Sequence, residues 1–583
     1  MKPVRRRWYA KRTIPHLCSL LAVGLVLVPG LYADGPDSSD RPGSSDVGGV
    51  TPVENNLVKI IPVTDSLYTT VDLLYNEAGL APPSGSRPWS IDEWYRVIRR
   101  LDDTRLSPSG ERALDRIHER LRREQEYNIA RGDTFQADLS FTVALEAYGH
   151  SNLDDFPEES DWVFGYTRRG SAAKLAGELD LGSWFYLYSD LEYRKNRYAH
   201  NESEDSADSS KIYNHHFSTN LHTLHDLDFE SPYRAFFAVG GDRWNLAAGR
   251  DLMRWGHGTS GNFVLNDHLD FHDMLRFVSY HDRVKFEATY LFLEHSGWLE
   301  PDPDKKGDLL GRRENPTPGT RMFLAHRLEF RPLDWLSLAL TENVMYQHDY
   351  VEPRFLNPAF IYHNLNNRSM FNAIASAEVE AVVLPGVTLL GQYSMYQARA
   401  PLEGGSQPDA MGYLAGYRVV RPWREGYLYH TLEGVYSDTY MYQRDLVDMK
   451  VIRRQFVESY RFELNRQFLG YPWGGDVVVL HGTVGYHEPE HFELTLDLFH
   501  LWRGEIGIDT EIEDTGDFDL DRQAPSGTVE RMFRAGVEGR WTPWDTLSLF
   551  SRVDFVHVTN KNNEKSSPVW DFQYALGASW TLR

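Results

Sequence analysis

Residues 135–149 read FQADLSFTVALEAYG, with an apolar side chain at every second position. Because successive side chains of a strand point to opposite faces, this period of two predicts a strand with one apolar and one polar face. The C-terminal stretch WDFQYALGASWTLR (570–583) alternates in the same way. We therefore expect long strands with two different faces across the region that these stretches bound.

Two kinds of connection separate such strands. RPLDWLSL (331–338) and TPWDTLSL (542–549) share the pattern P-x-D-x-L-S-L, in which proline presets φ and aspartate can bond the backbone of a tight turn. Other connections are long and acidic, at 200–210, 300–319 and 509–527. Tight turns that alternate with long polar loops are typical of a transmembrane antiparallel β-barrel, in which closure pairs every backbone group.

The composition agrees with a barrel over residues 131–583. Aromatic residues make up 13% of the chain, although its mean hydropathy is only −0.49, which is what alternating strands without long apolar runs produce. A soluble exported sandwich or propeller is the alternative, but its strands are usually shorter. The fold class that we predict is mainly β, with a small helical unit ahead of the barrel.

The N-terminus has the features of an export signal. A basic head precedes the apolar run Leu17–Leu31, so we predict a signal peptide over residues 1–33, with a single membrane anchor as the alternative. The only cysteine, Cys18, lies inside this segment. Residues 34–62 are rich in Gly, Ser, Asp and Pro and are predicted to form a disordered acidic linker. The expected location is the outer membrane of a diderm bacterium.

Residues 63–130 change to a helical period and predict a periplasmic helical bundle. Asp65 is placed to cap a first helix that stops at Gly79. Ser90 and Glu93 have the spacing of a capping box, and Pro108 takes the first position of a third helix. Three short amphipathic helices bury little surface alone, so we expect them to pack on the barrel.

Several classes of ligand are disfavoured. The net charge of −23 argues against a nucleic-acid partner. HEPEHFE (487–493) is not a zinc motif, because its proline breaks the helix that would align the two histidines, and we predict a strand-end turn there. In DFDLD (517–521) the next residue is Arg522, where an EF-hand needs glycine. The sequence predicts no metal and no cofactor.

One stretch could form a site. GRDLMRWGHGTSGNFVLNDH (249–268) gathers polar and aromatic residues among glycines. One hypothesis is direct ligand binding; the other is a structural loop whose glycines let the chain bend into the barrel mouth or lumen. A catalytic pair of His257 and Ser260 is a third hypothesis. The candidate ligand-binding residues are Arg250, Arg254, Trp255, His257, Asn262, Asn266, Asp267 and His268.

Several motifs give the chain a family resemblance. They are DLLYNEAGL (72–80), RPWSIDEWYRVIRRL (87–101), SPSGERALDRIHERL (107–121), AAGRDLMRWGHGTSGNFVLND (247–267) and RFLNPAFIYHNL (354–365). In their order they resemble the capsule-assembly (Wzi-like) outer-membrane proteins. The resemblance implies an 18-stranded barrel with a periplasmic helical bundle and a lectin-type role in organising surface polysaccharide, without catalysis. The long acidic loops and the terminal Arg583 depart from the family pattern.

We therefore expect a monomeric, non-enzymatic barrel that binds, anchors or organises surface or capsular polysaccharide. Aromatic and polar side chains of its outer loops would bind the sugar, and outer-membrane lipid would surround the wall. Periplasmic or export-machinery proteins are further candidate partners, through the helices. The main alternative is a porin or transport channel, and an outer-membrane hydrolase is the third. A lumen filled by inward side chains would favour the polysaccharide-binding function over the channel.

Overall fold

The computed structural model describes residues 56–583. Its gaps are at 102–105, 127–129, 132–134, 198–214, 295–319, 349, 360, 363–370, 398–407, 444–446, 459–460, 511–518 and 520. The predicted signal and the acidic loops at 200–210 and 300–319 lie outside the described residues, as does part of the loop at 509–527. No helix among the described residues is long and apolar enough to cross a membrane.

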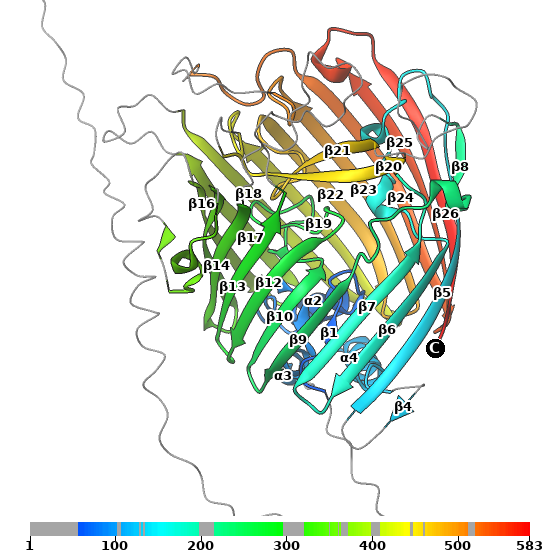
Figure 1. Cartoon of the computed structure of the whole chain (residues 1–583), viewed down its shortest axis with the longest axis vertical. Coiled ribbons are helices and arrows are strands. Elements are labelled where there is room, and N and C mark those ends of the chain that lie inside the picture. The colour runs from blue at the N-terminus through cyan, green and yellow to red at the C-terminus, as the bar shows by residue number, and fades with distance from the viewer. Residues whose placement is uncertain are drawn as a thin grey trace, which may run out of the picture.

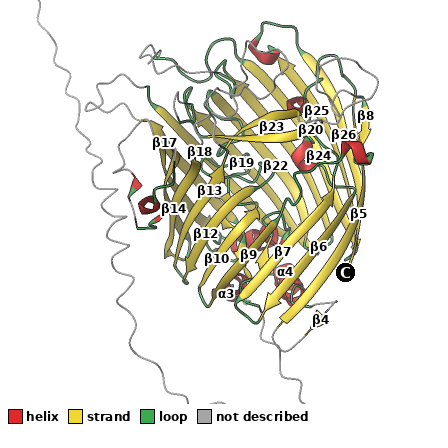
Figure 2. Cartoon of the chain, in the orientation of Figure 1, coloured by secondary structure: helices red, strands yellow, loops and turns green. Residues whose placement is uncertain are grey.

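Eighteen long antiparallel strands close into a barrel, in which the last strand pairs with the first (Figures 1 and 2). The transmembrane β-barrel fold predicted from the alternation is confirmed. The strands are β5 (Phe135–His150), β6 (Ala173–Leu181), β7 (Phe185–Tyr193), β9 (Ala235–Gly241), β10 (Trp244–Asp251), β12 (His272–Tyr280), β13 (Val284–Leu293), β14 (Thr320–Leu333), β15 (Leu336–His348), β16 (Phe371–Leu384), β17 (Val387–Gln397), β18 (Ala410–Trp423), β19 (Gly426–Ser437), β22 (Val477–Glu488), β23 (Phe492–Arg503), β24 (Glu530–Trp544), β25 (Leu547–Thr559) and β26 (Val569–Leu582).

Shorter elements accompany these strands. Both β4 (Ala130–Arg131) and β8 (Phe217–Thr219) pair with β5. The remaining short strands are β1 (Ile60–Ile61), β2 (Ser86–Arg87), β3 (Trp89–Ser90), β11 (Arg254–Trp255), β20 (Lys450–Glu458) and β21 (Arg461–Phe468). The described 3-10 helices are η2 (Glu159–Asp161), η3 (Tyr166–Arg168), η4 (Leu224–Asp226), η6 (Pro353–Leu356) and η9 (Lys561–Asn563).

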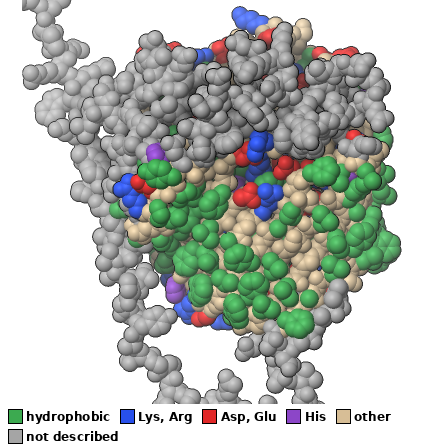
Figure 3. All heavy atoms as spheres, in the orientation of Figure 1, with side chains coloured by type: hydrophobic (Ala, Val, Ile, Leu, Met, Phe, Trp, Pro, Cys, Tyr) green, Lys and Arg blue, Asp and Glu red, His purple; other side chains and the backbone are tan. Residues whose placement is uncertain are grey.

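The two faces of the wall differ as the sequence pattern predicts. On β23, Leu494, Leu496 and Leu498 are exposed on the outside, whereas the intervening Asp497 faces the lumen. Apolar side chains spread over the outer surface in Figure 3. A set of exposed tryptophans lies beside the tight turns, as in the aromatic girdles of outer-membrane barrels: Trp184, Trp244, Trp335, Trp423 and Trp544.

The predicted tight turns and the caps at Asp65 and Ser107 are confirmed. Both P-x-D-x-L-S-L stretches form the turns β14–β15 and β24–β25, each with a register shift. The helices are α2 (Leu67–Glu77), α3 (Ile91–Arg99) and α4 (Pro108–Arg123). Asp65 Oδ1 accepts a hydrogen bond from the Leu67 amide (2.9 Å), and Ser107 Oγ accepts one from Gly110 (3.2 Å).

The predicted capping box is formed only in part. Ser90 Oγ accepts a hydrogen bond from the Glu93 amide at 3.4 Å. The Glu93 carboxylate does not reach back to the cap, because it accepts a hydrogen bond from Lys285 Nζ of the barrel wall at 2.6 Å. A side chain expected to cap the helix instead attaches the helix to the barrel.

The helical unit lies inside the barrel at the end of the tight turns (Figure 1). The Ala81 amide donates to the Asp334 carbonyl (2.7 Å), Ser109 Oγ to the Arg424 carbonyl (2.5 Å) and Arg123 to Glu490 (2.8 Å). Arg583, the residue that departs from the family pattern, donates to Glu124 just after α4 at 3.3 Å. Turns around the barrel therefore hold the unit in place.

This unit begins earlier than predicted. The linker was expected to extend to residue 62, but the structure is described from Asn56, and β1 pairs with β3. Val58 and Ile60 are fully or almost fully buried. The boundary moves because these apolar side chains pack in the lumen, a contact that the local composition does not reveal.

Two connections fold inward from the long-loop end. Segment 252–271 lies between β10 and β12, and the β20–β21 hairpin belongs to the connection 438–476. Both contribute to the largest apolar cluster inside the barrel, through Trp255, Leu265 and Leu469 among others. Their residues occupy lumen space that an open pore would leave to water.

A third connection packs on the outside of the wall. Phe355 of η6 and Tyr362 lie against the outward residues Tyr290 of β13 and Tyr346 of β15. Tyr290 Oη donates to the Leu356 carbonyl at 2.8 Å. The described residues of this connection, 350–359 and 361–362, therefore form a flap on the exterior of the barrel near the long-loop end, and they include the described part of the RFLNPAFIYHNL motif.

Candidate functional site

Segment 252–271 is held deep in the lumen by the N-terminal unit. β11 of this segment pairs with β2 of the unit, with Arg254 opposite Arg87. Trp255 is fully buried, and its Nε1 donates to Glu287 of β13 at 3.0 Å. The stretch that could form a site is thus part of the contact between the barrel wall and the N-terminal unit (Asn56 to the end of α4), here called the plug.

Two of its glycines are required by close approach. Gly256 has φ +102°, and a Cβ there would lie 2.4 Å from Asn262 Oδ1. Gly261 has φ +138°, and its Cβ would lie 2.4 Å from Pro472 Cδ. Both backbone conformations disfavour L side chains. These contacts agree with the hypothesis that the glycines let the chain bend into the lumen.

His257 belongs to a buried charged network that joins three parts of the barrel. Its Nδ1 lies 2.5 Å from Glu380 of β16, and its Nε2 lies 3.2 Å from Arg87. Arg87 also donates to Asp72 of α2 at 2.6 Å. Burial raises the pKa of Asp72, but Arg87, His257 and Arg418 together lower it by more, so the net shift is downward. Asp72 is thus an ionised partner that holds the plug.

The predicted pair of His257 and Ser260 is not hydrogen-bonded. Ser260 Oγ bonds to Glu433 and lies 3.1 Å from Tyr471 Oη. The Thr259 and Ser260 amides donate to the Glu433 carboxylate at 2.8 and 3.0 Å. The backbone donors that could stabilise an oxyanion are therefore bonded to a carboxylate, an arrangement that fastens the loop to β19.

A second chain of hydrogen bonds fastens the same loop to the neighbouring wall. Thr259 Oγ1 lies 3.1 Å from His481 Nδ1, and His481 Nε2 lies 2.7 Å from Asp497 Oδ2. Asp497 also accepts from Arg534 at 2.9 Å. All four residues line a cavity.

The remaining candidates bond mainly to one another. Asn262 Nδ2 donates to Asn266 Oδ1 at 3.1 Å, and Asn266 lies 3.2 Å from His268 Nδ1. Arg254 donates to the Gly256 carbonyl (3.3 Å) and lies 3.7 Å from Asp267. Burial lowers the pKa of His268 to about 4, so this ring is neutral at pH 7. Asn262 and Asn266 are buried and cannot contact a ligand at the cell surface.

Arg250 is separate from the other candidates. It bonds Asp273 on the outer side of the wall (2.8 Å) and lies 3.6 Å from the centre of the Phe271 ring. Of the eight predicted residues, Arg254 and His257 are the two that line the main cavity. Ligand binding by the predicted set stays a prediction.

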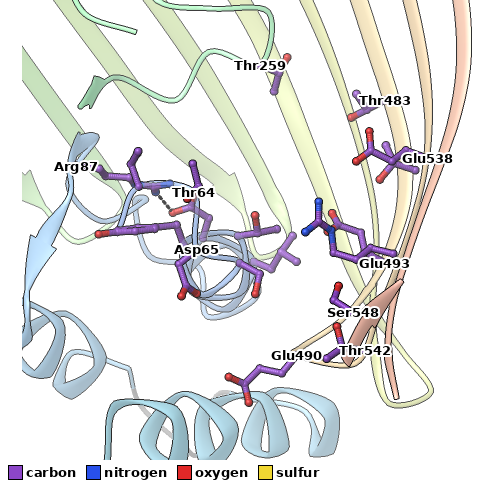
Figure 4. A pocket seen from close by; sticks show the side chains of 18 of the residues that line it. Thr64, Asp65, Arg87, Thr259, Thr483, Glu490, Glu493, Glu538, Thr542 and Ser548 are labelled. Carbon is purple, nitrogen blue, oxygen red and sulfur yellow. Dashed lines mark hydrogen bonds and ion pairs between the residues drawn. The ribbon is translucent and has the colours of Figure 1, made fainter. Parts of the chain in front are cut away.

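The main cavity lies inside the barrel and has a volume of about 1300 Å³. In Figure 4 it separates the helices of the plug from the wall strands that carry Thr483, Glu493 and Glu538. Its further lining includes Thr64, Asp65, Asp72, Arg87, Arg120, Arg123, Arg168, Thr259, Ser260, Arg418, Tyr429, Thr431, Trp473, His481, Glu490, Thr495, Asp497, Phe499, Arg534, Thr542, Asp545, Ser548, Arg552, Thr581 and Arg583.

Sequence reasoning missed the wall side of this cavity. The signal was present in FELTLDLF (492–499), where Glu493, Thr495 and Asp497 alternate with leucines. Alternation identifies the polar face, but only the strand register shows which polar faces meet around one space. Among the residues that the structure describes, no group of three or more His, Cys, Asp or Glu could hold a metal ion.

Comparison with known proteins agrees with the class that the geometry defines, an outer-membrane β-barrel. No family model and no curated relative matches the chain. Its structure is similar to that of Wzi, an outer-membrane protein involved in group 1 capsule assembly in Escherichia coli and a carbohydrate-binding β-barrel. That match has 13% identity and a TM-score of 0.55, and it covers 89% of this chain and 98% of Wzi. At this identity the likeness shows the fold alone.

Weaker matches include two proteins of Acinetobacter baumannii. The outer-membrane channel DcaP is 10% identical, with a TM-score of 0.31 and coverage of 78% of this chain and 100% of that chain. OccAB4 is 10% identical, with a TM-score of 0.38 and coverage of 76% and 98%. Neither likeness is close enough to carry an argument.

Proposed function

We propose that this chain is a non-conducting outer-membrane barrel that binds and retains surface polysaccharide without catalysis. The observation that carries the proposal is the obstructed lumen: two inward connections share one apolar cluster inside the barrel, and one of them pairs with the helical unit, so they fill the lumen on the long-loop side of the tight-turn half. A diffusion channel needs a continuous water path, whereas a binding protein needs a rigid wall with polar sites. The fold shared with a carbohydrate-binding barrel supports the same function.

The absence of catalysis is also part of the proposal. It is supported by the bonding of Ser260 to Glu433 and Tyr471 rather than to a histidine. A serine nucleophile needs a base within hydrogen-bond reach. An outer-membrane hydrolase remains the third candidate, and loss of lipid or ester hydrolysis in a Ser260→Ala variant would favour it.

The proposal is tested in a strain that lacks the gene. We expect polysaccharide to leave the cell surface and accumulate in the medium, and complementation by the full chain to restore it. In planar bilayers the purified chain should give no stepwise conductance, which separates it from the porin alternative. Unchanged retention of polysaccharide in the deletion strain would contradict the proposal.

A further inference from the structure

The two ends of the lumen cavity differ in chemistry. Along β23 the inward positions Glu493, Thr495 and Asp497 line the cavity, and Phe499 is the last residue of this row to do so. The next inward residue, Leu501, is fully buried in the apolar cluster. The polar space therefore occupies the half of the barrel nearest the tight turns.

A roof separates this space from the long-loop end. Phe499 is only 3% exposed, and its ring lies 5.3 Å from that of Trp473, which belongs to the inward connection 438–476. Arg168 of η3 donates to Glu538 at 2.8 Å, so a second connection also reaches over the cavity. The packed rings and the apolar cluster that contains Leu501 thus cover the cavity along β23, whereas the Arg168 side chain is 41% exposed.

The opposite end is bordered by exposed residues. Asp545 in the β24–β25 turn has a side chain that is 79% exposed, and that of Arg583 is 46% exposed. Both line the cavity, as does the exposed Thr546. Among the described residues, the lining therefore meets solvent at the tight-turn end.

The charges of the lining are largely paired. Arg534 donates to Asp497 at 2.9 Å, and Arg552 donates to Glu538 at 2.7 Å. The lining as a whole carries ten arginines and nine acidic residues, so opposite charges nearly balance and the cavity does not favour a polyanion. The chain is acidic overall, with a net charge of −23, which also disfavours an acidic polymer.

The uncharged part of the lining is rich in hydroxyl groups. Thr431, Thr483, Thr495, Thr542 and Thr581 all contribute. Threonine hydroxyls can donate and accept hydrogen bonds with sugar hydroxyls, and ionised carboxylates can accept them. The half-buried rings of Trp473 and Tyr429 in the lining offer apolar faces on which a pyranose can stack. A concave site with convergent polar groups and a few aromatic faces fits a small polar ligand.

We propose that this cavity binds an uncharged oligosaccharide segment of the same polysaccharide and that the segment enters from the tight-turn side, as a contact separate from the one that retains the polymer at the cell surface. The inference rests on the proposed function and adds the site, the ligand class and the direction of entry. The sugar hydroxyls bond the threonines and carboxylates of the wall, and the roof limits how far the segment reaches. The long-loop surface is then not the site of this contact.

A pair of neighbouring substitutions tests the site. Thr483 faces the cavity, whereas Val484 is 54% exposed on the outer wall. We expect Thr483→Trp to place an indole ring against the wall side of the cavity and to weaken binding of neutral oligosaccharides by at least about tenfold, which corresponds to about 1.4 kcal/mol. The probes are neutral and acidic oligosaccharides released from the polysaccharide of the source strain. Val484→Trp, with the same side chain on the other face, should bind like the original chain.

The outcomes separate this inference from the proposed function. If the unaltered chain binds no polysaccharide, both fail. If the chain and both variants bind equally well, the cavity is not the site, although polysaccharide binding stands. Tighter binding of acidic than of neutral probes would overturn the assigned ligand class. A heat-modifiable gel shift shows whether each variant has a folded barrel.

The direction of entry is tested by labelling. The chain has one cysteine, Cys18, so a Cys18→Ser background allows a single probe at Thr483→Cys. In outer-membrane vesicles from a porin-deficient host, a charged maleimide should label this cysteine only after the vesicles are opened, and neutral oligosaccharide should slow the reaction. A control Ser567→Cys, in an exposed loop at the opposite end, should react in both cases. Equal labelling of Thr483→Cys in closed vesicles would overturn entry from the tight-turn side.

Discussion

Removal of Arg276 should loosen the plug without unfolding the barrel. This arginine of β12 forms two hydrogen bonds with Glu287, at 2.8 and 2.9 Å, and donates to the Pro88 carbonyl of the plug at 2.8 Å. The side chains of Arg276 and Glu287 are each 1% exposed. In Arg276→Met the carboxylate would stay buried after losing its guanidinium partner.

The expected cost follows from this geometry. Truncating one partner of a buried ion pair costs about 3–5 kcal/mol, because an uncompensated charge is left behind. If this cost falls on docking of the plug, amides of residues 86–99 should exchange with deuterium at least about a hundredfold faster. Hydrogen exchange followed by mass spectrometry measures this directly in micelles. A heat-modifiable gel shift checks that the barrel is still closed.

Two further variants make the reasoning refutable. Phe277→Leu changes the neighbouring outward residue and should leave exchange of the plug unchanged. Adding Glu287→Gln to Arg276→Met should recover part of the loss, because the remaining buried group carries no charge but still accepts from Trp255. Exchange in Arg276→Met within about threefold of the original chain would refute the claim that this pair holds the plug.

Three other changes have defined outcomes. Because the folded pKa of Asp72 is lowered, its stabilisation of docking is full above about pH 4 and is lost as the pH falls through the folded pKa. Asp72→Asn should therefore loosen the plug at pH 7 and remove the acid dependence of its hydrogen exchange. If the variant keeps that dependence, a group other than Asp72 causes it. Phe355→Ala removes a buried ring of the outer flap and should weaken the packing of the flap on the wall by about 3 kcal/mol. Proteases added to intact cells should then cleave the flap. If the variant resists proteolysis as well as the original chain does, Phe355 does not hold the flap. Gly261→Ala strains a backbone at φ +138° and should lower the stability of the folded barrel by about 1–3 kcal/mol. A smaller share of the protein should then show the heat-modifiable gel shift of a folded barrel. Gly507→Ala, where an added Cβ has nothing within 4 Å, should have little effect.

The barrel could be predicted because apolar and polar residues alternate along each strand, one face lying on the outside of the barrel and the other in the lumen. The alternation in residues 135–149 and the repeated turn pattern are local, and so are the caps at Asp65 and Ser107. The half-formed capping box shows the limit of local reasoning. Glu93 has the right spacing for a cap, but a lysine on a distant strand binds its carboxylate.

The candidate site depended on contacts that sequence spacing does not encode. Gly256 and Gly261 could be recognised as bends, but what they approach is Asn262 and Pro472, and Pro472 comes from another connection. The pairing register of the strands decides which polar residues line the cavity, because residues of several strands face one space only after the barrel closes. The RFLNPAFIYHNL motif likewise did not reveal that it packs on the outside of the wall.

The most direct test of the central claim is equilibrium binding of the purified full chain to the surface polysaccharide of its own strain. Isothermal titration in detergent micelles would measure it, with neutral oligosaccharides from the same polymer as competitors. We predict saturable binding that the oligosaccharides displace. A flat titration with a barrel shown to be folded would contradict the account.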